Sequence, residues 1–229
     1  MQPQGFVIAA TGLKAEARIA ERSEGVIAVA GGGDEARLAS LIEAAIAEGA
    51  RGIVSFGIAG ALQPGLMPGM CIVGLSVVSE GQSFPANERW SSRMLASLPD
   101  AVGGVVAGTP KAIADVKAKA AAYEATGAVA VDMESHVVTR IAREHSLPFA
   151  VLRVIADTAV QRLPPAAAGG LKPDGSPDIA GVLRSLVSEP GQLPDLIRTA
   201  LATRRAMNGL LRCHRLLGPG LGFRLVDFG

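Results

Sequence analysis

The sequence predicts a three-layer α/β fold, in which helices flank a mixed, twisted central sheet on both faces. Short runs of Val, Ile and Ala alternate with longer helical patterns, the element order of layered α/β proteins with many parallel strand pairs. Most of these runs are apolar throughout, as expected of strands that helices cover on both sides. Hydrophobic residues make up 49% of the chain and aromatic residues only 3%, so the predicted core consists of Ala, Val, Leu and Ile.

The strands are predicted from the apolar runs and the helices from their caps and periodicity. The expected strands are Phe6–Thr11, Val26–Ala30, Gly52–Phe56, Met70–Ser79, Gly104–Gly108, Ala128–Asp132 and Pro148–Ile155. The expected helices are Leu13–Arg22, Asp34–Glu48 with Asp34 as N-cap, Lys111–Glu124 after Pro110, and Glu134–His145. The glycines at 31–33 lack the spacing and the lysine of a nucleotide-binding loop, so they predict a strand-to-helix turn.

The length of 229 residues predicts one domain that spans residues 1–229. Residues 161–178 are rich in Pro and Gly and predict a long flexible loop. Residues 195–217 predict a helix in which five arginines alternate with apolar residues. Two interpretations of this basic helix are open: a surface helix that packs its apolar face on the core, or an amphipathic helix that contacts a membrane surface.

Charge and composition exclude several classes of protein. A formal net charge of +1 and few aromatic residues argue against a nucleic-acid partner. Cys71 and Cys213 form neither a metal-ligand spacing nor a disulfide framework, so we expect reduced thiols and no metal. The chain starts without a basic signal-peptide region and has no apolar run of about 18 residues, which predicts a cytoplasmic protein. A dinucleotide-binding glycine motif is missing after the first strand, which argues against an oxidoreductase.

Acidic side chains follow two of the predicted strands. Asp132 and Glu134 come at the end of one strand, and Asp157 at the end of the next. Because neighbouring strand ends converge on one cleft, we expect these carboxylates to face a common cavity. Glycosidic chemistry needs such a set, since one group protonates the leaving group and another stabilises the sugar. From the residues alone, Asp157 can also be interpreted as only a helix N-cap.

The same segments resemble a known family. Val131-Asp132-Met133-Glu134, followed by Arg153-Val-Ile-Ala-Asp157, is similar to the signature of the purine nucleoside phosphorylase/uridine phosphorylase superfamily, particularly the nucleosidases of methylthioadenosine and S-adenosylhomocysteine. The Phe56–Gly60 segment resembles the Gly-x-Ala-Gly turn that follows the third strand of that family. Glu16 stands where these nucleosidases place the Glu that activates water. The resemblance covers about residues 6–160.

The resemblance implies a role for each matched residue. Asp157 would donate a proton to the adenine ring, which requires a desolvated carboxyl with a raised pKa. Glu134 would bind the ribose hydroxyls, and Met133 would pack against the sugar. Glu16 would position the nucleophilic water; its alternative is a solvated helix residue. The substrate-binding set is completed by Ile58, Ala59 and Gly60 beside the ribose and by Ile113 as an apolar face for the base.

Other residues depart from the family pattern or have structural interpretations. Ile58 stands where the family often has a Ser or Thr that meets phosphate, and Ala156 replaces the usual Ser before the acid. Ile113 lies in a segment that lacks the usual stacking Phe. Arg153 is expected to be an ion-pair partner, and His136 a packing residue.

The short chain, its start and its Arg-rich tail also resemble the hopanoid-associated phosphorylases, which implies adenine release from adenosylhopane. No cofactor is implied, although inorganic phosphate is an alternative to water as co-substrate. The implied partners are a small nucleoside, lipid-linked in this case, a membrane surface at the C-terminal helix, and further copies in a homo-oligomer. The alternatives are a general purine nucleoside phosphorylase or methylthioadenosine/S-adenosylhomocysteine nucleosidase, and a non-catalytic nucleoside-binding module.

Overall fold

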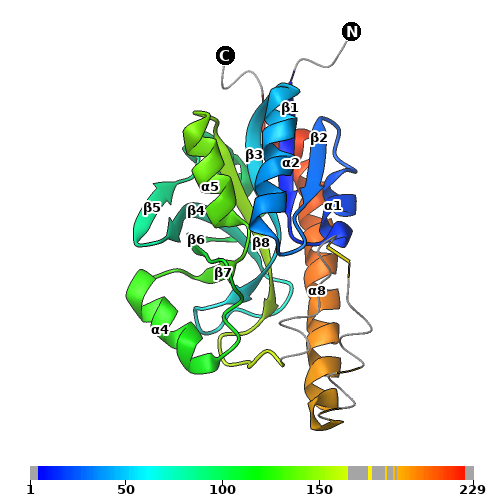
Figure 1. Ribbon diagram of the computed structural model, residues 1–229, viewed down its shortest axis with the longest axis vertical. Helices are drawn as coiled ribbons and strands as arrows, with labels where there is room; N and C mark the ends of the chain where they lie inside the picture. The colour runs from blue at the N-terminus through cyan, green and yellow to red at the C-terminus, as the bar shows by residue number, and fades with distance from the viewer. Residues whose placement is uncertain (1–4, 165–174, 177–183, 185–187, 189, 225–229) are drawn as a thin grey trace.

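The computed structural model describes residues 5–164, 175–176, 184, 188 and 190–224. An eight-stranded sheet lies between helices on both of its faces (Figure 1). The mixed sheet and its two helical layers confirm the predicted fold class. Most of the loop predicted at 161–178 lies outside the described residues.

The sheet combines parallel and antiparallel strand pairs. Its strands are β1 (Phe6–Thr11), β2 (Val26–Ala30), β3 (Ala50–Ala61), β4 (Cys71–Ser79), β5 (Gln82–Pro85), β6 (Val102–Gly108), β7 (Ala130–Asp132) and β8 (Phe149–Asp157). The order is β2-β1-β3-β7-β6-β4-β5, and β8 pairs with both β3 and β4. Strands β3, β7, β6, β4 and β8 therefore close into a ring. Within it, β3–β7 and β4–β8 are antiparallel, whereas β3–β8, β4–β6 and β6–β7 are parallel.

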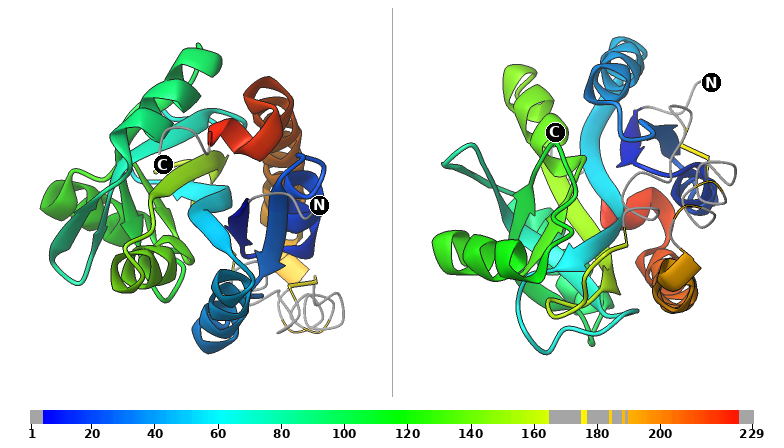
Figure 2. Two further views of the ribbon diagram at one scale, coloured as in Figure 1. Left: turned by 90° about the horizontal axis from the view of Figure 1, so that it is seen from above. Right: turned by 60° about the horizontal axis from the view of Figure 1, so that its bottom comes forward.

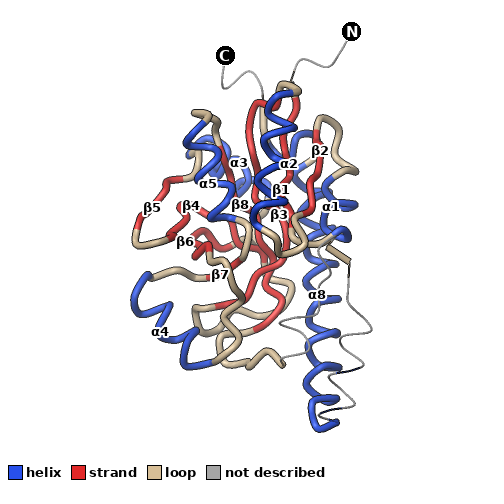
Figure 3. The backbone as a smooth tube through the Cα atoms, viewed as in Figure 1, coloured by secondary structure: helices blue, strands red, loops and turns tan. Residues whose placement is uncertain are grey.

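Two apolar cores lie on opposite faces of the sheet. The helices are α1 (Lys14–Ala20), α2 (Glu35–Ala47), α3 (Glu88–Ser97), α4 (Val116–Thr126), α5 (Ser135–Glu144) and α8 (Leu193–Leu217). Ile8 of β1 packs with α2 and α5, while its neighbour Val7 packs with α1, α3 and α8. This alternation explains why the strands are apolar throughout, because each face of the pleat meets a helical layer. Figure 3 shows the strands between these helices, and Figure 2 shows α8 beside α1.

Two predicted boundaries were wrong by five residues each: the end of the third strand and the start of the helix at Lys111. The Phe56–Gly60 segment is not a turn after the third strand, because β3 continues to Ala61 and pairs in parallel with β8 up to Asp157. The helix predicted at Lys111–Glu124 begins only at Val116. The Asp115 carboxylate accepts hydrogen bonds from the backbone N–H groups of Lys117 and Ala118, and this cap sets the start of α4.

Two elements were missed by the sequence analysis. Strand β5 has four residues, ends in Pro85 and pairs only with β4 among the described strands, so it carries little periodic pattern. Helix α3 begins after Asn87, whose side chain accepts from the backbone N–H of Trp90. It buries Trp90 and Met94 against the sheet.

The predicted basic helix is α8, which begins at Leu193 rather than 195. Its C-terminal half packs on the sheet through buried residues such as Ala206 and Leu210. Its N-terminal half extends past the sheet (Figure 1) and exposes Leu193, Ile197 and Leu201. No helix among the described residues is both long and apolar enough to cross a membrane.

Candidate active site

A cavity of about 280 Å³ lies at the carboxyl ends of β1, β3, β7 and β8. Its wall also includes the segment after β1, the loop before α4 and the N-terminal half of α8. All eight predicted site residues line it, together with nine others: Glu16, Ile58, Ala59, Gly60, Ile113, Met133, Glu134 and Asp157, with Gly12, Leu13, Ala112, Val131, Asp132, Ala156, Leu163, Thr199 and Thr203. The structure therefore places the acids at residues 16, 134 and 157 on one cavity.

Arg153 is the centre of a buried ionic cluster on one side of this cavity. Its side chain has no exposed surface; Nε lies 2.9 Å from Asp132 Oδ2, and Nη1 lies 3.1 Å from Glu134 Oε2. Nη2 donates to Ser55 Oγ at 2.5 Å. Arg153 is thus an ion-pair partner, as the sequence predicted, and its charge is shared between two carboxylates.

Asp132 organises the start of α5. Its Oδ1 accepts hydrogen bonds from the backbone N–H groups of Glu134 and Ser135 at 3.0 and 2.7 Å. Its Oδ2 accepts from Ser135 Oγ at 2.5 Å and pairs with Arg153. These contacts hold the backbone that carries Met133 and Glu134, so Asp132 acts as an anchor for the residues that face the cavity.

Glu16 is buried, with 2% of its surface exposed, so the interpretation as a solvated helix residue was wrong. Its Oε2 accepts from the backbone N–H groups of Gly12 and Leu13 at 3.0 and 2.8 Å, and its Oε1 accepts from that of Ile58 at 2.8 Å. Burial raises the pKa of Glu16, although Arg153 and these three donors oppose the shift. Oε1 carries one of these bonds and Oε2 two, so Oε1 retains acceptor capacity.

Glu134 pairs with Arg153 and lies near two other acids, Asp132 and Glu16. Burial raises the pKa of Glu134 to about 7; Arg153 opposes the shift, while Asp132 and Glu16 add to it. Two glycines make room for this cluster. A Cβ on Gly12 would lie 2.5 Å from Glu134 Oε1, and one on Gly57 would lie 2.7 Å from both Arg153 Nη1 and Glu16 Oε1.

Asp157 also lines the cavity and pairs with a residue that the sequence analysis missed. The ammonium of Lys119, on α4, forms an ion pair with Asp157 Oδ2. It also donates to the backbone carbonyl oxygens of Thr158 and Gln161, each at 3.0 Å. Burial raises the pKa of Asp157 and Lys119 opposes the rise. Residues 158–164, which follow Asp157 directly, contain no helix, so Asp157 is not an N-cap.

Nothing in the sequence around Lys119 distinguishes it from its neighbours. It belongs to an Ala- and Lys-rich helix in which Lys117 is exposed and Lys119 fully buried. Only the docking of α4 beside the end of β8 decides which lysine is enclosed.

His136 lies outside the cavity and pairs with Glu35 at 3.1 Å. The glycines at 31–33 form the turn between β2 and α2, as predicted. Among the described residues, no cluster of His, Cys, Asp or Glu could hold a metal ion.

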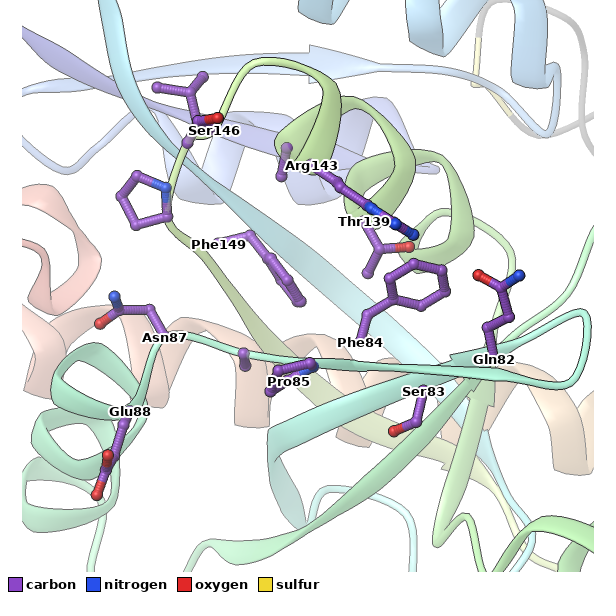
Figure 4. A pocket seen from close by; sticks show the side chains of 14 residues that line it. Gln82, Ser83, Phe84, Pro85, Asn87, Glu88, Thr139, Arg143, Ser146 and Phe149 are labelled. Carbon is purple, nitrogen blue, oxygen red and sulfur yellow. The ribbon is translucent and has the colours of Figure 1, made fainter.

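A larger hollow of about 670 Å³ lies between the β4–β5 hairpin and α5. Figure 4 shows Phe84 and Phe149 on its wall, with Thr139 and Arg143 contributed by α5. None of the predicted site residues lines this hollow. Its size does not make it the reaction site, because the buried carboxylates with raised pKa values surround the smaller cavity.

Comparisons with known proteins identify the family and the fold. Residues 14–172 match the family described as Phosphorylase superfamily. No curated protein sequence matches. Futalosine hydrolase of Helicobacter pylori strain 26695 is 16% identical, with a TM-score of 0.64, over 81% of this chain and 98% of that one. A methylthioadenosine/S-adenosylhomocysteine nucleosidase from Colwellia psychrerythraea 34H, solved with adenine, is 17% identical, with a TM-score of 0.63, over 80% and 96%. At such identities, the structural similarity establishes the shared fold.

Proposed function

Because the chain belongs to the phosphorylase superfamily and is an enzyme of that group, we propose that it cleaves the N-glycosidic bond of a 5′-substituted adenosine and releases adenine. The observation that carries this proposal is that Asp157 and Glu134 line one cavity and belong to separate ion pairs, with Lys119 and with Arg153. N-glycoside cleavage needs a proton at the departing base and negative charge beside a sugar that becomes an oxocarbenium ion. A cavity lined by two carboxyl groups in different surroundings can supply both.

In this mechanism each acid has its own task. Asp157 protonates the base, and its desolvated carboxyl suits a proton donor near neutral pH. The Glu134 carboxylate accepts from the ribose hydroxyls, while Met133 packs on the sugar. Glu16 Oε1 holds the attacking water, since Oε1 accepts only one of the three backbone hydrogen bonds to this side chain.

The cavity favours water over phosphate as the second substrate. None of its described lining residues is Arg or Lys, and the nearby Arg153 already pairs with two carboxylates. A phosphate ion requires charged donors, which makes hydrolysis the better supported of the two reactions. Incubation of 5′-substituted adenosines with and without phosphate, followed by measurement of free adenine, tests both proposals. Adenine release that depends on phosphate would contradict hydrolysis but not glycosidic cleavage.

We further propose a large apolar 5′ substituent, with adenosylhopane as the specific substrate. The wall of the cavity is rich in apolar side chains, among them Leu13, Ile113 and Leu163. An apolar 5′ substituent would be covered by these side chains. An adenosine with a long 5′-alkyl chain should therefore have a lower KM than methylthioadenosine. Equal or weaker binding of the alkyl compound would favour a methylthioadenosine/S-adenosylhomocysteine nucleosidase.

Helix α8 supports a proposal of peripheral membrane contact. Its exposed apolar residues lie among arginines, the composition of helices that bind anionic lipid surfaces. Co-sedimentation with vesicles of phosphatidylglycerol, compared with vesicles of neutral lipid, tests the contact. Failure to bind the anionic vesicles would contradict it. The cytoplasmic location and the homo-oligomer stay predictions from the sequence.

A further inference from the structure

Lys119 is enclosed behind the cavity wall rather than in it. Its side chain has no exposed surface, and it does not line the cavity, whereas Asp157 does. The ammonium meets three oxygen acceptors, from the side chain of Asp157 and the carbonyl groups of Thr158 and Gln161. All three of its N–H bonds are thus used, and Asp157 stands between this cation and the cavity.

This arrangement affects the proton that Asp157 is proposed to deliver. In the empty site, the ammonium stabilises the Asp157 carboxylate and so opposes the rise in pKa that burial causes. Whenever Asp157 is ionised, it has no proton of its own to give to a departing base. The nearest proton is on the Lys119 ammonium, which forms a direct ion pair with Asp157.

We propose that Lys119 is a positioning residue that supplies the proton of Asp157, so that the two side chains act as one donor with one transferable proton. The inference rests on the proposed function. As the C–N bond breaks, its electron pair goes to the base, a proton moves from the Lys119 ammonium to the Asp157 carboxylate, and the carboxyl proton passes to the base. Lys119 is left as a neutral amine and Asp157 as a carboxylate. Water adds to the sugar and releases one proton, and Lys119 regains a proton from the cavity through Asp157.

The charged surroundings separate this pair from the other acids. Helix α4 contributes Lys119 and β8 contributes Asp157. Arg153 and Glu134 form a separate ion pair in the ionic cluster. Among the described residues, Lys119 is the charged group that shifts the pKa of Asp157, and it opposes the effect of burial. A carboxyl alone keeps its proton only up to its own pKa, whereas a pair that contains an ammonium keeps one to higher pH.

The decisive experiment is the pH profile of kcat/KM for adenine release by the full chain and by Lys119→Met. The variant should remain active at low pH and lose activity at a pH more than about one unit below that of the wild type. A uniform reduction with an unchanged profile would indicate a merely structural lysine and overturn the proposal. Lys117→Met, which changes an exposed lysine on the same helix, should leave the profile unchanged.

A second variant separates charge from proton supply. Lys119→Arg keeps a cation beside Asp157, but a guanidinium does not give up its proton in proteins. Adenine release should therefore fall at every pH, and wild-type activity in this variant would contradict proton supply by Lys119. Should Lys119→Met fail to fold, Lys119→Gln carries the same expectation, because it keeps N–H donors for the two carbonyl groups.

A readout that is independent of activity distinguishes failure of this inference from failure of the proposed function. Carbon-13 NMR of aspartate carboxyls, assigned with Asp157→Asn, reports the protonation of Asp157 directly. In the wild type its titration should end at lower pH than in Lys119→Met, since Lys119 holds the carboxylate ionised. Identical titrations would overturn the coupling, whatever reaction the enzyme catalyses.

Discussion

The two groups of charged residues at the cavity differ in their balance of charge. On the proposed sugar side, Asp132 and Glu134 pair with one arginine, and Glu16 lies close enough to add to the negative charge. On the proposed base side, one lysine pairs with one aspartate. The first arrangement has an excess of negative charge and the second is balanced.

This difference indicates how one cavity can hold acids with separate tasks. The excess on the sugar side suits a group that develops positive charge, because a nearby carboxylate stabilises an oxocarbenium ion. The Lys119–Asp157 pair can donate a proton to the base and then regain one. Variants that remove a charge from one side should therefore have different effects from those that remove one from the other.

The largest effect is expected from Arg153→Met. It would leave buried carboxylates without their shared cation, and breaking such a buried pair costs about 3–5 kcal/mol of stability. Denaturant unfolding monitored by circular dichroism measures the loss. Arg140→Met is the matched control, since Arg140 forms only an exposed pair with Glu144 at 3.7 Å and should change stability by less than about 1 kcal/mol. Similar values for both variants would contradict the ionic cluster.

Asp157→Asn should remove the base-side proton while leaving the sugar side intact. We expect kcat/KM for adenine release to fall by about 10²–10⁴-fold, the contribution of a positioned acid. A riboside with 4-nitrophenolate as leaving group needs no protonation, so its cleavage should change far less. Asp115→Asn is the control, because Asn also caps a helix well. Equal losses for both substrates would show that Asp157 does not act as the acid.

Much of the fold was predictable because every strand except β5 is marked by an apolar run. The acids at 134 and 157 were predicted to face one cavity, and both line it, although β7 and β8 pair with β3 rather than with each other. The length of β3 was not, because Gly57 and Gly60 suggest a turn in sequence. In the structure these glycines leave space for Arg153, Glu16 and Asp157 instead.

Lys119 and the burial of Glu16 could not be predicted, because both depend on tertiary contacts. Lysines on a polar helix are normally solvated, and only the approach of α4 to the end of β8 encloses this one. Glu16 is held by backbone N–H groups from two separate segments, a contact that has no local sequence pattern. The functional roles of the site residues stay predictions, which the variants proposed above would test.

Gly12→Ala should disturb the sugar side alone. The new Cβ would lie 2.5 Å from Glu134 Oε1 and would push this carboxylate out of place. A displacement of about 1 Å can cost up to about 10²-fold in rate, so kcat/KM should fall by about 10- to 10²-fold. Gly191→Ala is the control, since nothing lies within 4 Å of a Cβ there. An unchanged kcat/KM in Gly12→Ala would argue against a role for Glu134 in binding ribose.

The smallest expected effect is a pH dependence of stability that arises from the sugar side. The pKa of Glu134 is raised from 4.5 to about 7, so between these values the folded protein holds a proton that the unfolded chain has lost. Stability should therefore fall as pH rises through this range, because ionisation adds charge to a buried cluster. Glu134→Gln should weaken this decline, measured as unfolding midpoints at pH 5 and 8. Glu144→Gln, at an exposed carboxyl, should leave the decline as it is. A wild-type protein that becomes more stable over this range would show that Arg153 outweighs burial, and Glu134 would then be ionised throughout.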